Sequence, residues 1–336
     1  MSSVAVVILN YNGKELLKKF LPGVIDHSAG ARVIVADNNS TDGSKEFLAQ
    51  EFPAIEMIPI SSNLGFCGGY NYALQQIESD YYLLLNSDVE VTANWLSPMV
   101  DLLDGDETTA AVQPKILSFD EKNKFEHAGA GGGFIDTLGY PFCRGRIFDQ
   151  LEEDKGQYDD SIPVFWSSGA CLMIRSSLFK SFNGFDETFF AHMEEIDLCW
   201  RLKRAGHQIM YCGASQVYHM GGGTLSESNP RKTYYNFRNG LILLIKNLDP
   251  LNLVIKLPFR IILDTIAAFM FLANGKGGSF VAVAKAHFFI LTRLFVLLGK
   301  RTGTYKVDQV YPGSIVFDYF LSGKTKFKNL DFNNPK

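Results

Sequence analysis

The sequence predicts an α/β fold built on a doubly wound sheet, followed by a helical region at the C-terminal end. Three observations lead to this prediction. Short apolar runs alternate with amphipathic stretches through the first hundred residues, Asn or Asp follows the end of each run, and the chain from about residue 231 is mostly apolar with regularly spaced charges. Alternation of strand and helix is typical of doubly wound sheets, whose ligands bind beyond the carboxyl ends of the strands.

Each element of the first half has its own signal. The run 4-VAVVIL-9 is continuously apolar, as expected for a strand buried on both faces. The stretch 42-DGSKEFLAQEF-52 opens with a good helix N-cap, and the helix expected at about 194–205 has Glu194 and Glu195 in its first turn, where the helix dipole favours negative charge. The other expected elements are strands at 32–37, 55–60 and 81–85 and helices at 14–25 and from the glycine-rich 63–71 to about 77.

Composition limits the class of protein. The 336 residues are 46% hydrophobic and carry a net charge of −4, which predicts a globular chain without a nucleic-acid partner. The five cysteines are odd in number and contain no C-x-x-C pair, so we expect reduced thiols in a cytoplasmic protein. The N-terminal MSSVAVVILN has no basic stretch and no cleavage site, so no signal peptide is expected.

Polar residues follow four successive predicted strands. They are Asn10, Asp37 with Asn39, Asn63, and the tripeptide Asn86-Ser87-Asp88. Turn chemistry alone would explain one such group, because Asn and Asp favour turns. Four groups at the same edge of a sheet favour a binding site.

The stretch 81-YYLLLNSDVEV-91 ends a buried strand in a carboxylate, Asp88. Burying an unpaired charge is costly, so Asp88 needs a partner or a chemical role. His219 is one candidate partner, since it ends a short predicted strand beside the three glycines of 217-VYHMGGG-223. Asp, His and phosphate oxygens together suit Mn²⁺ or Mg²⁺, although a lone His is as often structural. The glycine-rich 65-GFCGGYN-71 is a weak nucleotide signal, because it is neither a P-loop nor a good G-x-G-x-x-G motif.

The rest of the chain is less regular. The pattern weakens between about 118 and 165, where the charged 151–160 is either a solvated loop or a lid facing an acceptor. In the C-terminal region, Lys256, Arg260 and Asp264 recur every four residues, and a second charged face carries Lys285, Arg293 and Lys300. Apolar helices with narrow basic stripes suit a membrane interface. Packing on the preceding domain, with the charges in solvent, is the alternative.

Taken together, these motifs resemble the family 2 glycosyltransferases with a GT-A fold, a Rossmann-like mixed sheet flanked by helices, and in particular their bacterial rhamnosyltransferase-like branch. The resemblance covers about residues 4–225, and the tail from 231 is similar to the helical, membrane-associated ends of that branch. The motifs that carry it are 7-VILNYN-12, 37-DNNSTDGS-44, 63-NLGFCGGYN-71, 86-NSD-88, 169-GACLMIR-175, 184-GFDETFFAHMEEIDLCWRLKRAGH-207 and 219-HMGG-222.

The resemblance implies a catalytic domain over 1–230, with a nucleotide-binding half (1–100) and an acceptor-binding half (101–230), and a membrane-associating helical region over 231–336. It also implies roles for single residues. Asp88 would bind the metal within the position of the D-x-D motif, where Asn86 replaces the first Asp, and His219 would complete the metal or diphosphate site. Glu195 would be the general base, with Glu194 in reserve. Contacts with the nucleotide sugar would come from Asn10, Asp37, Asn39, Asn63, Gly68, Asn71, Asn86 and Asp88.

The implied function is an inverting transfer of a sugar from a nucleotide-diphosphate sugar, on dTDP or UDP, with Mn²⁺ or Mg²⁺ as cofactor. Rhamnose is one candidate sugar, and the acceptor would be a hydroxyl of a growing surface polysaccharide or a lipid-linked glycan at the inner face of the cell membrane. A sugar nucleotidyltransferase is the alternative enzyme, but the stretch 10-NYNGKELLK-18 is a poor version of its glycine-rich, basic loop. An inactive sugar-nucleotide-binding subunit is the third possibility; loss of Asp88, the acidic pair or His219 would have supported it.

Overall fold

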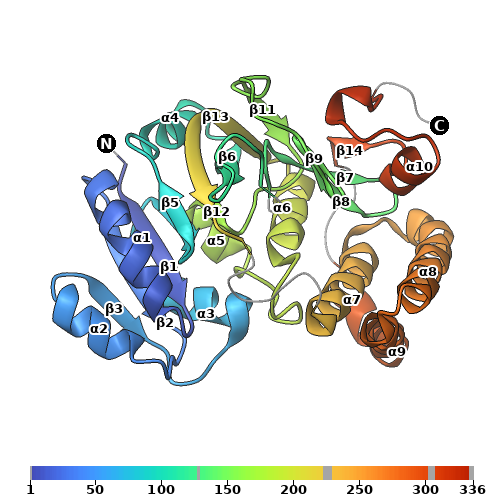
Figure 1. Cartoon of the computed structure of the whole chain (residues 1–336), viewed down its shortest axis with the longest axis horizontal. Helices are drawn as coiled ribbons and strands as arrows, with labels where there is room; N and C mark the ends of the chain where they lie inside the picture. The colour runs from blue at the N-terminus through green and yellow to red at the C-terminus, as the bar shows by residue number, and fades with distance from the viewer. Residues whose placement is uncertain (1, 127–128, 222–228, 302–306, 333–336) are drawn as a thin grey trace.

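The computed structural model of the chain describes residues 2–126, 129–221, 229–301 and 307–332 (Figure 1). A nine-stranded mixed sheet lies at its centre, with the order β11-β13-β6-β12-β4-β1-β2-β3 and with β5 paired to β13. The predicted α/β class, a mixed sheet flanked by helices, is confirmed. Its strands are β1 (Val4–Asn10), β2 (Arg32–Asp37), β3 (Glu56–Pro59), β4 (Tyr81–Asn86), β5 (Val89–Val91), β6 (Thr109–Ser118), β11 (Ser161–Val164), β12 (Cys171–Arg175) and β13 (Gln208–His219).

The first four strands are parallel and bring their polar ends to one edge. In the register of the sheet, Asn10 of β1 lies beside Asp37 of β2, and Leu9 lies beside Asn86 of β4. Strand β12 then runs antiparallel to both β4 and β6. The gathering of Asn and Asp at one rim therefore follows from the parallel register.

Helices cover both faces of the sheet, which explains why the first strand is apolar throughout. In β1, Val4, Val6 and Ile8 join the core under one set of helices, and Ala5 and Val7 join the core under the other. The first set consists of α1 (Lys14–His27), α2 (Ser44–Glu51) and α4 (Ser97–Gly105), and the second of α3 (Gly65–Leu74), α5 (Ser176–Ser181) and α6 (Glu194–Arg204).

The middle of the chain forms a small second sheet that the sequence did not reveal. Its order is β10-β9-β8-β7-β14. The strands are β7 (Gly133–Asp136), β8 (Pro141–Cys143), β9 (Arg146–Ile147), β10 (Gln150–Leu151) and β14 (Val310–Tyr311). The acidic run 151–160 is more than a solvated loop, because Asp154 and Asp159 pair with the buried Lys115. Strands of two to four residues are too short to show a period in the sequence.

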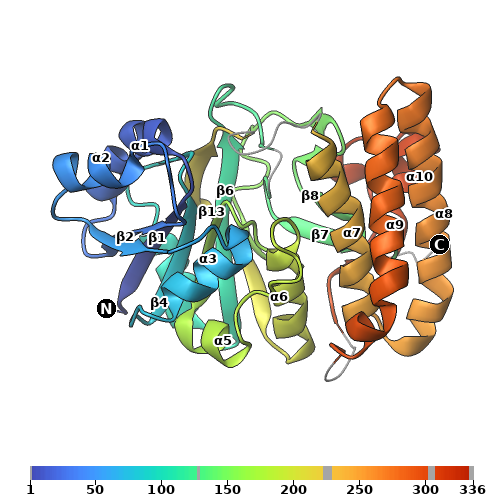
Figure 2. The same cartoon turned by 90° about the horizontal axis from the view of Figure 1, so that it is seen from below.

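The C-terminal region is helical, as predicted, and is joined to the sheet. It contains α7 (Pro230–Asn247), α8 (Pro250–Ala273), α9 (Gly277–Leu298), α10 (Ile315–Phe320) and the short 3₁₀ helix η1 (Phe327–Asn329). Figure 2 shows α7 between α6 and α9. Residues 241–245 of α7 are fully buried in the same core as α6, and β14 pairs with β7. The predicted division into 1–230 and 231–336 stays a prediction.

One of the two predicted charged stripes does not face a membrane. Arg260 and Asp264 are only 3% and 1% exposed, and they form an ion pair with an Nε–Oδ1 distance of 2.9 Å. Arg260 also donates to the carbonyl oxygens of Leu138 and Gly139, and its guanidinium lies 3.6 Å from the centroid of the Tyr140 ring. The interpretation of this stripe as an interfacial face is wrong: it docks α8 on the β7–β8 turn. A four-residue spacing of charges shows that they share a helix face, but not what that face meets.

The exposed side of the C-terminal region carries most of the large exposed apolar side chains of the described residues. Among the described residues, Tyr11, Leu64 and Tyr72 are the only large exposed hydrophobic side chains outside it. Helix α9, at Gly277–Leu298, is the one described helix with the length and composition to cross a membrane. The largest exposed fractions belong to Leu251, Val254, Phe288, Leu291, Phe295 and Leu321.

Candidate active site

Asp88 and His219 meet at the end of the central sheet, as the sequence predicted. Asp88 lies in the turn between β4 and β5, His219 is the last residue of β13, and β13 pairs with β5 through His219 and Val89. The Nε2 atom of His219 is 3.1 Å from Oδ1 of Asp88, and both side chains are buried. The carboxylate at the tip of the apolar strand is therefore partnered.

Glu126 is a third member of this cluster and was not predicted. Its Oε2 atom is 3.2 Å from Nδ1 of His219, on the opposite side of the imidazole from Asp88. Burial lowers the pKa of His219, but hydrogen bonding and charge from Asp88 and Glu126 outweigh burial and raise the pKa to about 10. A single Glu in a segment without periodicity gave no signal in the sequence.

Asp88 and His219 could supply two ligands to a metal ion, which would have to take most of its ligands from elsewhere. Within the described ranges, no group of three or more His, Cys, Asp or Glu side chains is arranged to hold a metal. Two ligands at about 2.1 Å from an octahedral ion lie about 3.0 Å apart. The 3.1 Å separation of the Asp88 and His219 atoms is close to that spacing, but it is also the length of the hydrogen bond between them. Because the pKa of His219 is raised, its Nε2 atom has to lose a proton before it can ligate a metal. Glu126 occupies the place of the carboxylate that commonly orients a ligating imidazole.

The polar ends of β1 and β2 form a compact hydrogen-bonded turn around Ser40. The Ser40 hydroxyl accepts from Nδ2 of the fully buried Asn10 at 3.1 Å, and its backbone N–H donates to Oδ1 of the fully buried Asp37 at 2.9 Å. Asn39 takes a left-handed backbone conformation, with φ of 65°, which Asn tolerates better than most residues. These three predicted residues lie together at the rim of the sheet.

The predicted residues of the glycine-rich segment do not all face this rim. Asn63 lies beside it, where its Oδ1 accepts from Nδ2 of Asn38 at 3.2 Å. The side-chain amide of Asn71 forms two hydrogen bonds with the backbone of Phe185. Its Nδ2 donates to the carbonyl oxygen and its Oδ1 accepts from the N–H, both at 2.9 Å. A Cβ atom on Gly68 would lie only 2.8 Å from Cβ of Leu64, so this glycine permits close packing at the start of α3. Asn71 and Gly68 thus shape the segment.

The two acidic residues at the start of α6 have different surroundings. Glu194 is buried and lies near α3: the pKa values of Cys67 and Tyr70 are raised mainly by burial, and the charge of Glu194 adds a smaller effect in the same direction. Glu195 faces the loop before β12: a Cβ atom on Gly169 would lie 3.9 Å from its carboxyl carbon.

That loop connects Glu195 to the end of β4. The carbonyl oxygen of Ala170 accepts from the backbone N–H of Asn86 at 3.0 Å. Gly169 and Ala170 therefore link the surroundings of the Glu195 carboxyl group to the carboxyl end of β4.

The pKa of each of these two carboxyl groups is higher than usual for a glutamate, so each keeps its proton to a higher pH. Burial raises the pKa of Glu195 to about 7. Burial and the neighbouring charge of Glu195 raise the pKa of Glu194 well above its usual range. Oε2 of each has no hydrogen-bond partner among the described residues. A carboxylate with a pKa near neutrality and a free oxygen is suited to accept a proton.

Helix α7 holds the loop that leads to this acidic pair. Phe190, His192 and Met193 have φ values of 64°, 69° and 70°, an unusual run of left-handed non-glycine residues. The Nδ2 atom of Asn239 is fully buried against them and lies 3.2, 2.8 and 2.6 Å from the carbonyl oxygens of Phe189, Ala191 and His192. Sequence reasoning missed Asn239, because it lies in the polar first half of α7, among Asn236, Arg238 and other polar residues, and nothing in the pattern distinguishes it from a solvent-exposed residue.

Comparison with known protein families finds one match. The family model described as glycosyl transferase family 2 matches residues 5–181, which is more than half of the chain. The chain is 27% identical over 230 residues to an N-acetylglucosaminyl-diphospho-decaprenol L-rhamnosyltransferase of Mycobacterium tuberculosis, covering 64% of this chain and 75% of that protein. It is 25% identical over 225 residues to a rhamnosyltransferase of Escherichia coli, covering 64% and 83%.

Solved structures share the fold. A mannosyltransferase of Pyrobaculum calidifontis in complex with GDP-Man and Mn²⁺ aligns with a TM-score of 0.52 and 13% identity, covering 87% of this chain and 75% of that one. The structure of GalNAc-T7 with UDP, GalNAc and Mn²⁺ aligns with a TM-score of 0.56 and 14% identity, covering 74% of this chain. This chain spans about half of the length of GalNAc-T7, at 49%.

Proposed function

Because the chain belongs to glycosyltransferase family 2, and is therefore an enzyme that acts on nucleotide sugars, we propose that it is an inverting, metal-dependent transferase whose reaction centre lies between Asp88 and Glu195. The observation that carries the proposal is the placement of these two carboxylates. Asp88 is paired with His219 at the end of the sheet, and Glu195 is tied to the same strand end through Gly169 and Ala170.

The donor would bind along the rim formed by the parallel strands. Asp37, Asn39 and Asn10 would meet the nucleoside, Asn63 would extend that surface, and Asn86 would lie beside the diphosphate. Asp88 and His219 would hold Mn²⁺ or Mg²⁺, with Glu126 fixing the imidazole. Such an ion, when bound, neutralises the negative charge that develops on a departing diphosphate. Two of the aligned structures contain Mn²⁺, which supports a divalent ion in this fold.

Glu195 would act on the acceptor. A sugar hydroxyl is a poor nucleophile, and a carboxylate placed on the face opposite the leaving group removes its proton as the new bond forms. Attack from that face inverts the anomeric centre without a covalent sugar–enzyme intermediate. The raised pKa of Glu195 supports this role, because a base with a pKa near the working pH transfers protons most effectively.

The acceptor and the location of the enzyme are also part of the proposal. The names of the relatives include a rhamnosyltransferase that acts on a sugar carried by diphospho-decaprenol. We therefore expect a dTDP- or UDP-sugar as donor, with rhamnose as the first candidate, and a saccharide on a lipid diphosphate as acceptor. The exposed apolar side of α8–α10 supports attachment to the cytoplasmic face of the cell membrane.

A thermal-shift panel tests the donor site directly. The protein is heated with UDP, dTDP, GDP or CDP, each with Mn²⁺ or with EDTA. A ligand at 100 times its dissociation constant stabilises the folded state by about 2.7 kcal/mol, which is easily measured. We expect a metal-dependent shift with one diphosphate and its loss in Asp88→Ala. Absence of any shift would contradict the proposal, and a shift with intact protein but no transfer to any acceptor would favour the inactive binding subunit. A shift accompanied by release of diphosphate from a sugar 1-phosphate and a nucleoside triphosphate would favour a nucleotidyltransferase.

A further inference from the structure

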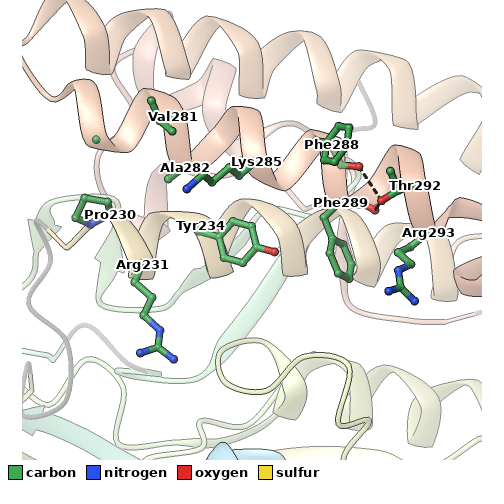
Figure 3. Close-up of a pocket in the computed structure, with 11 residues that line it drawn as sticks. Pro230, Arg231, Tyr234, Val281, Ala282, Lys285, Phe288, Phe289, Thr292 and Arg293 are labelled. Carbon is green, nitrogen blue, oxygen red and sulfur yellow. Dashed lines mark hydrogen bonds between the residues drawn. The ribbon is translucent and has the colours of Figure 1, made fainter.

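A groove of about 650 Å³ runs between α7 and α9 (Figure 3). Three cationic side chains line it, Arg231, Lys285 and Arg293, and no acidic residue does. All three are exposed, and no carboxylate within the described ranges forms an ion pair with any of them. Lys300, two residues beyond the end of α9, differs because it pairs with Asp186. The groove is thus a positively charged site without an internal counter-ion among the described residues.

The same groove has an apolar side that continues out of it. Val281 and Phe288 line the groove on α9 and are 48% and 68% exposed. Leu291 and Phe295 follow at helical spacing from Phe288 and are 75% and 87% exposed. Cationic groups therefore border a continuous exposed apolar strip. This combination suits a ligand with an anionic head and a long apolar chain.

One end of the groove borders the catalytic loop. The guanidinium of Arg231 lies 5.8 Å from the centroid of the Phe190 ring, four residues before Glu194. The carbonyl oxygen of Phe190 in turn accepts from the backbone N–H of Phe66 at 3.0 Å, at the start of α3. In Figure 3 the side chains of Arg231 and Arg293 extend to the same side of the two helices. A head group held here lies next to the loop that presents the acidic pair.

We propose that this groove binds the diphosphate of an isoprenoid-linked acceptor, with the isoprenoid chain lying along the apolar strip of α9. The inference rests on the proposed function, since it assigns a place to the acceptor of that reaction. Guanidinium groups pair with phosphate oxygens through two parallel hydrogen bonds, and ammonium groups act as point charges toward them. A diphosphate is favoured over the head group of a bulk phospholipid because the groove ends at the catalytic loop, where the sugar attached to the diphosphate must arrive.

The test measures binding of geranylgeranyl diphosphate in detergent micelles by isothermal titration calorimetry. The variant Lys285→Gln/Arg293→Gln removes two cations from the groove. Lys18→Gln/Lys328→Gln is the matched control, because it removes two exposed cations elsewhere that also form no ion pair within the described ranges. We expect at least tenfold weaker binding in the groove variant and unchanged binding in the control. Geranylgeraniol, which lacks the diphosphate, should bind both variants equally.

Three results would overturn the inference. The first is unchanged binding of geranylgeranyl diphosphate in the groove variant, and the second is a loss in the control variant as large as that in the groove variant. The third is that the groove variant loses binding to phosphatidylglycerol vesicles to the same extent as it loses binding to geranylgeranyl diphosphate, which would make the groove a general anionic-lipid surface. The nucleoside diphosphate panel is run on the same variants. A retained metal-dependent shift shows that the donor site is intact, so that failure of the groove is distinguished from failure of the proposed transferase.

Discussion

The side-chain nitrogen of Asn239 lies 2.6 Å from the carbonyl oxygen of His192, and through this contact helix α7 fixes the backbone that leads to Glu194 and Glu195. The C-terminal region is therefore part of the structure that positions the candidate base, in addition to any role at a membrane. Arg238 adds to the same support by donating to the carbonyl oxygens of Thr188 and Phe189 at 3.0 and 2.6 Å.

We predict that Asn239→Leu lowers kcat more than it changes the donor KM. The substitution leaves buried carbonyl groups without a donor, which costs about 1–3 kcal/mol and lets the left-handed loop relax. A displacement of about 1 Å at a reacting group can reduce turnover by about 10²-fold. Steady-state kinetics with a varied nucleotide sugar measure the effect. Thr233→Ala is the control, because its hydroxyl contacts Ser279 of α9 and not the loop. An unchanged kcat in a folded Asn239→Leu variant would contradict the positioning role.

Glu195→Gln is expected to slow transfer and to stabilise the protein at neutral pH. Its pKa in the folded state, about 7, is above the usual value of 4.5. The folded state therefore binds the proton more tightly than the unfolded state, and ionisation lowers the stability of the wild type as pH rises from 4.5 through 7. The variant should match the wild type in melting temperature at pH 4.5 and exceed it at pH 8.

The same assignment predicts a pH profile for the wild type. A base works only when it is ionised, so kcat/KM should rise with pH through about 7 and level off above it. Transfer in Glu195→Gln should fall by about 10²–10⁴-fold while the nucleotide-dependent thermal shift remains. If Glu195→Gln keeps near-normal transfer and Glu194→Gln loses it, the base is Glu194.

Glu126→Gln should weaken metal binding without removing it. A carboxylate that orients a ligating imidazole typically contributes a factor of about 10–100 in metal affinity. Titration of Mn²⁺ in the presence of the nucleoside diphosphate measures the change. Glu121→Gln is a matched control on the same segment, because Glu121 pairs with Lys124 at the surface. Equal Mn²⁺ affinity in the two variants would show that Glu126 does not orient His219.

The sequence predicted the parallel half of the sheet because β1 and β4 are buried almost throughout and β1, β2 and β4 each end in Asn or Asp. That pattern was enough to place Asp88 and His219 together, although 131 residues separate them. It was not enough to show that Asn71 bonds to Phe185, since the same amide suits a nucleotide or a backbone. The local sequence pattern predicts where a strand ends, but it does not predict which distant residue a polar side chain at that end will contact.

The second sheet and the docking face of α8 could not be predicted for related reasons. Residues 310–311 pair with β7 from a distant part of the chain, and two residues carry no period. Arg260 and Asp264 are spaced as in an exposed helix, yet they are buried because Tyr140 and two backbone carbonyls receive the guanidinium. Charge spacing is set by the helix, whereas burial is set by the surface that the helix meets.

The Arg260–Asp264 pair provides a test of how α8 is attached. Arg260→Met should reduce the free energy of unfolding by about 3–5 kcal/mol, because the buried Asp264 loses its cation and keeps only the Tyr140 hydroxyl, at 3.0 Å, and His287, at 4.0 Å. The double variant Arg260→Met/Asp264→Leu removes both charges and should regain most of that loss, since apolar replacements of buried pairs are often neutral. Urea unfolding of the three proteins at pH 7 measures the differences. If Arg260→Met is no less stable than the wild type, α8 does not depend on this pair, and its attachment rests on its apolar contacts with α9.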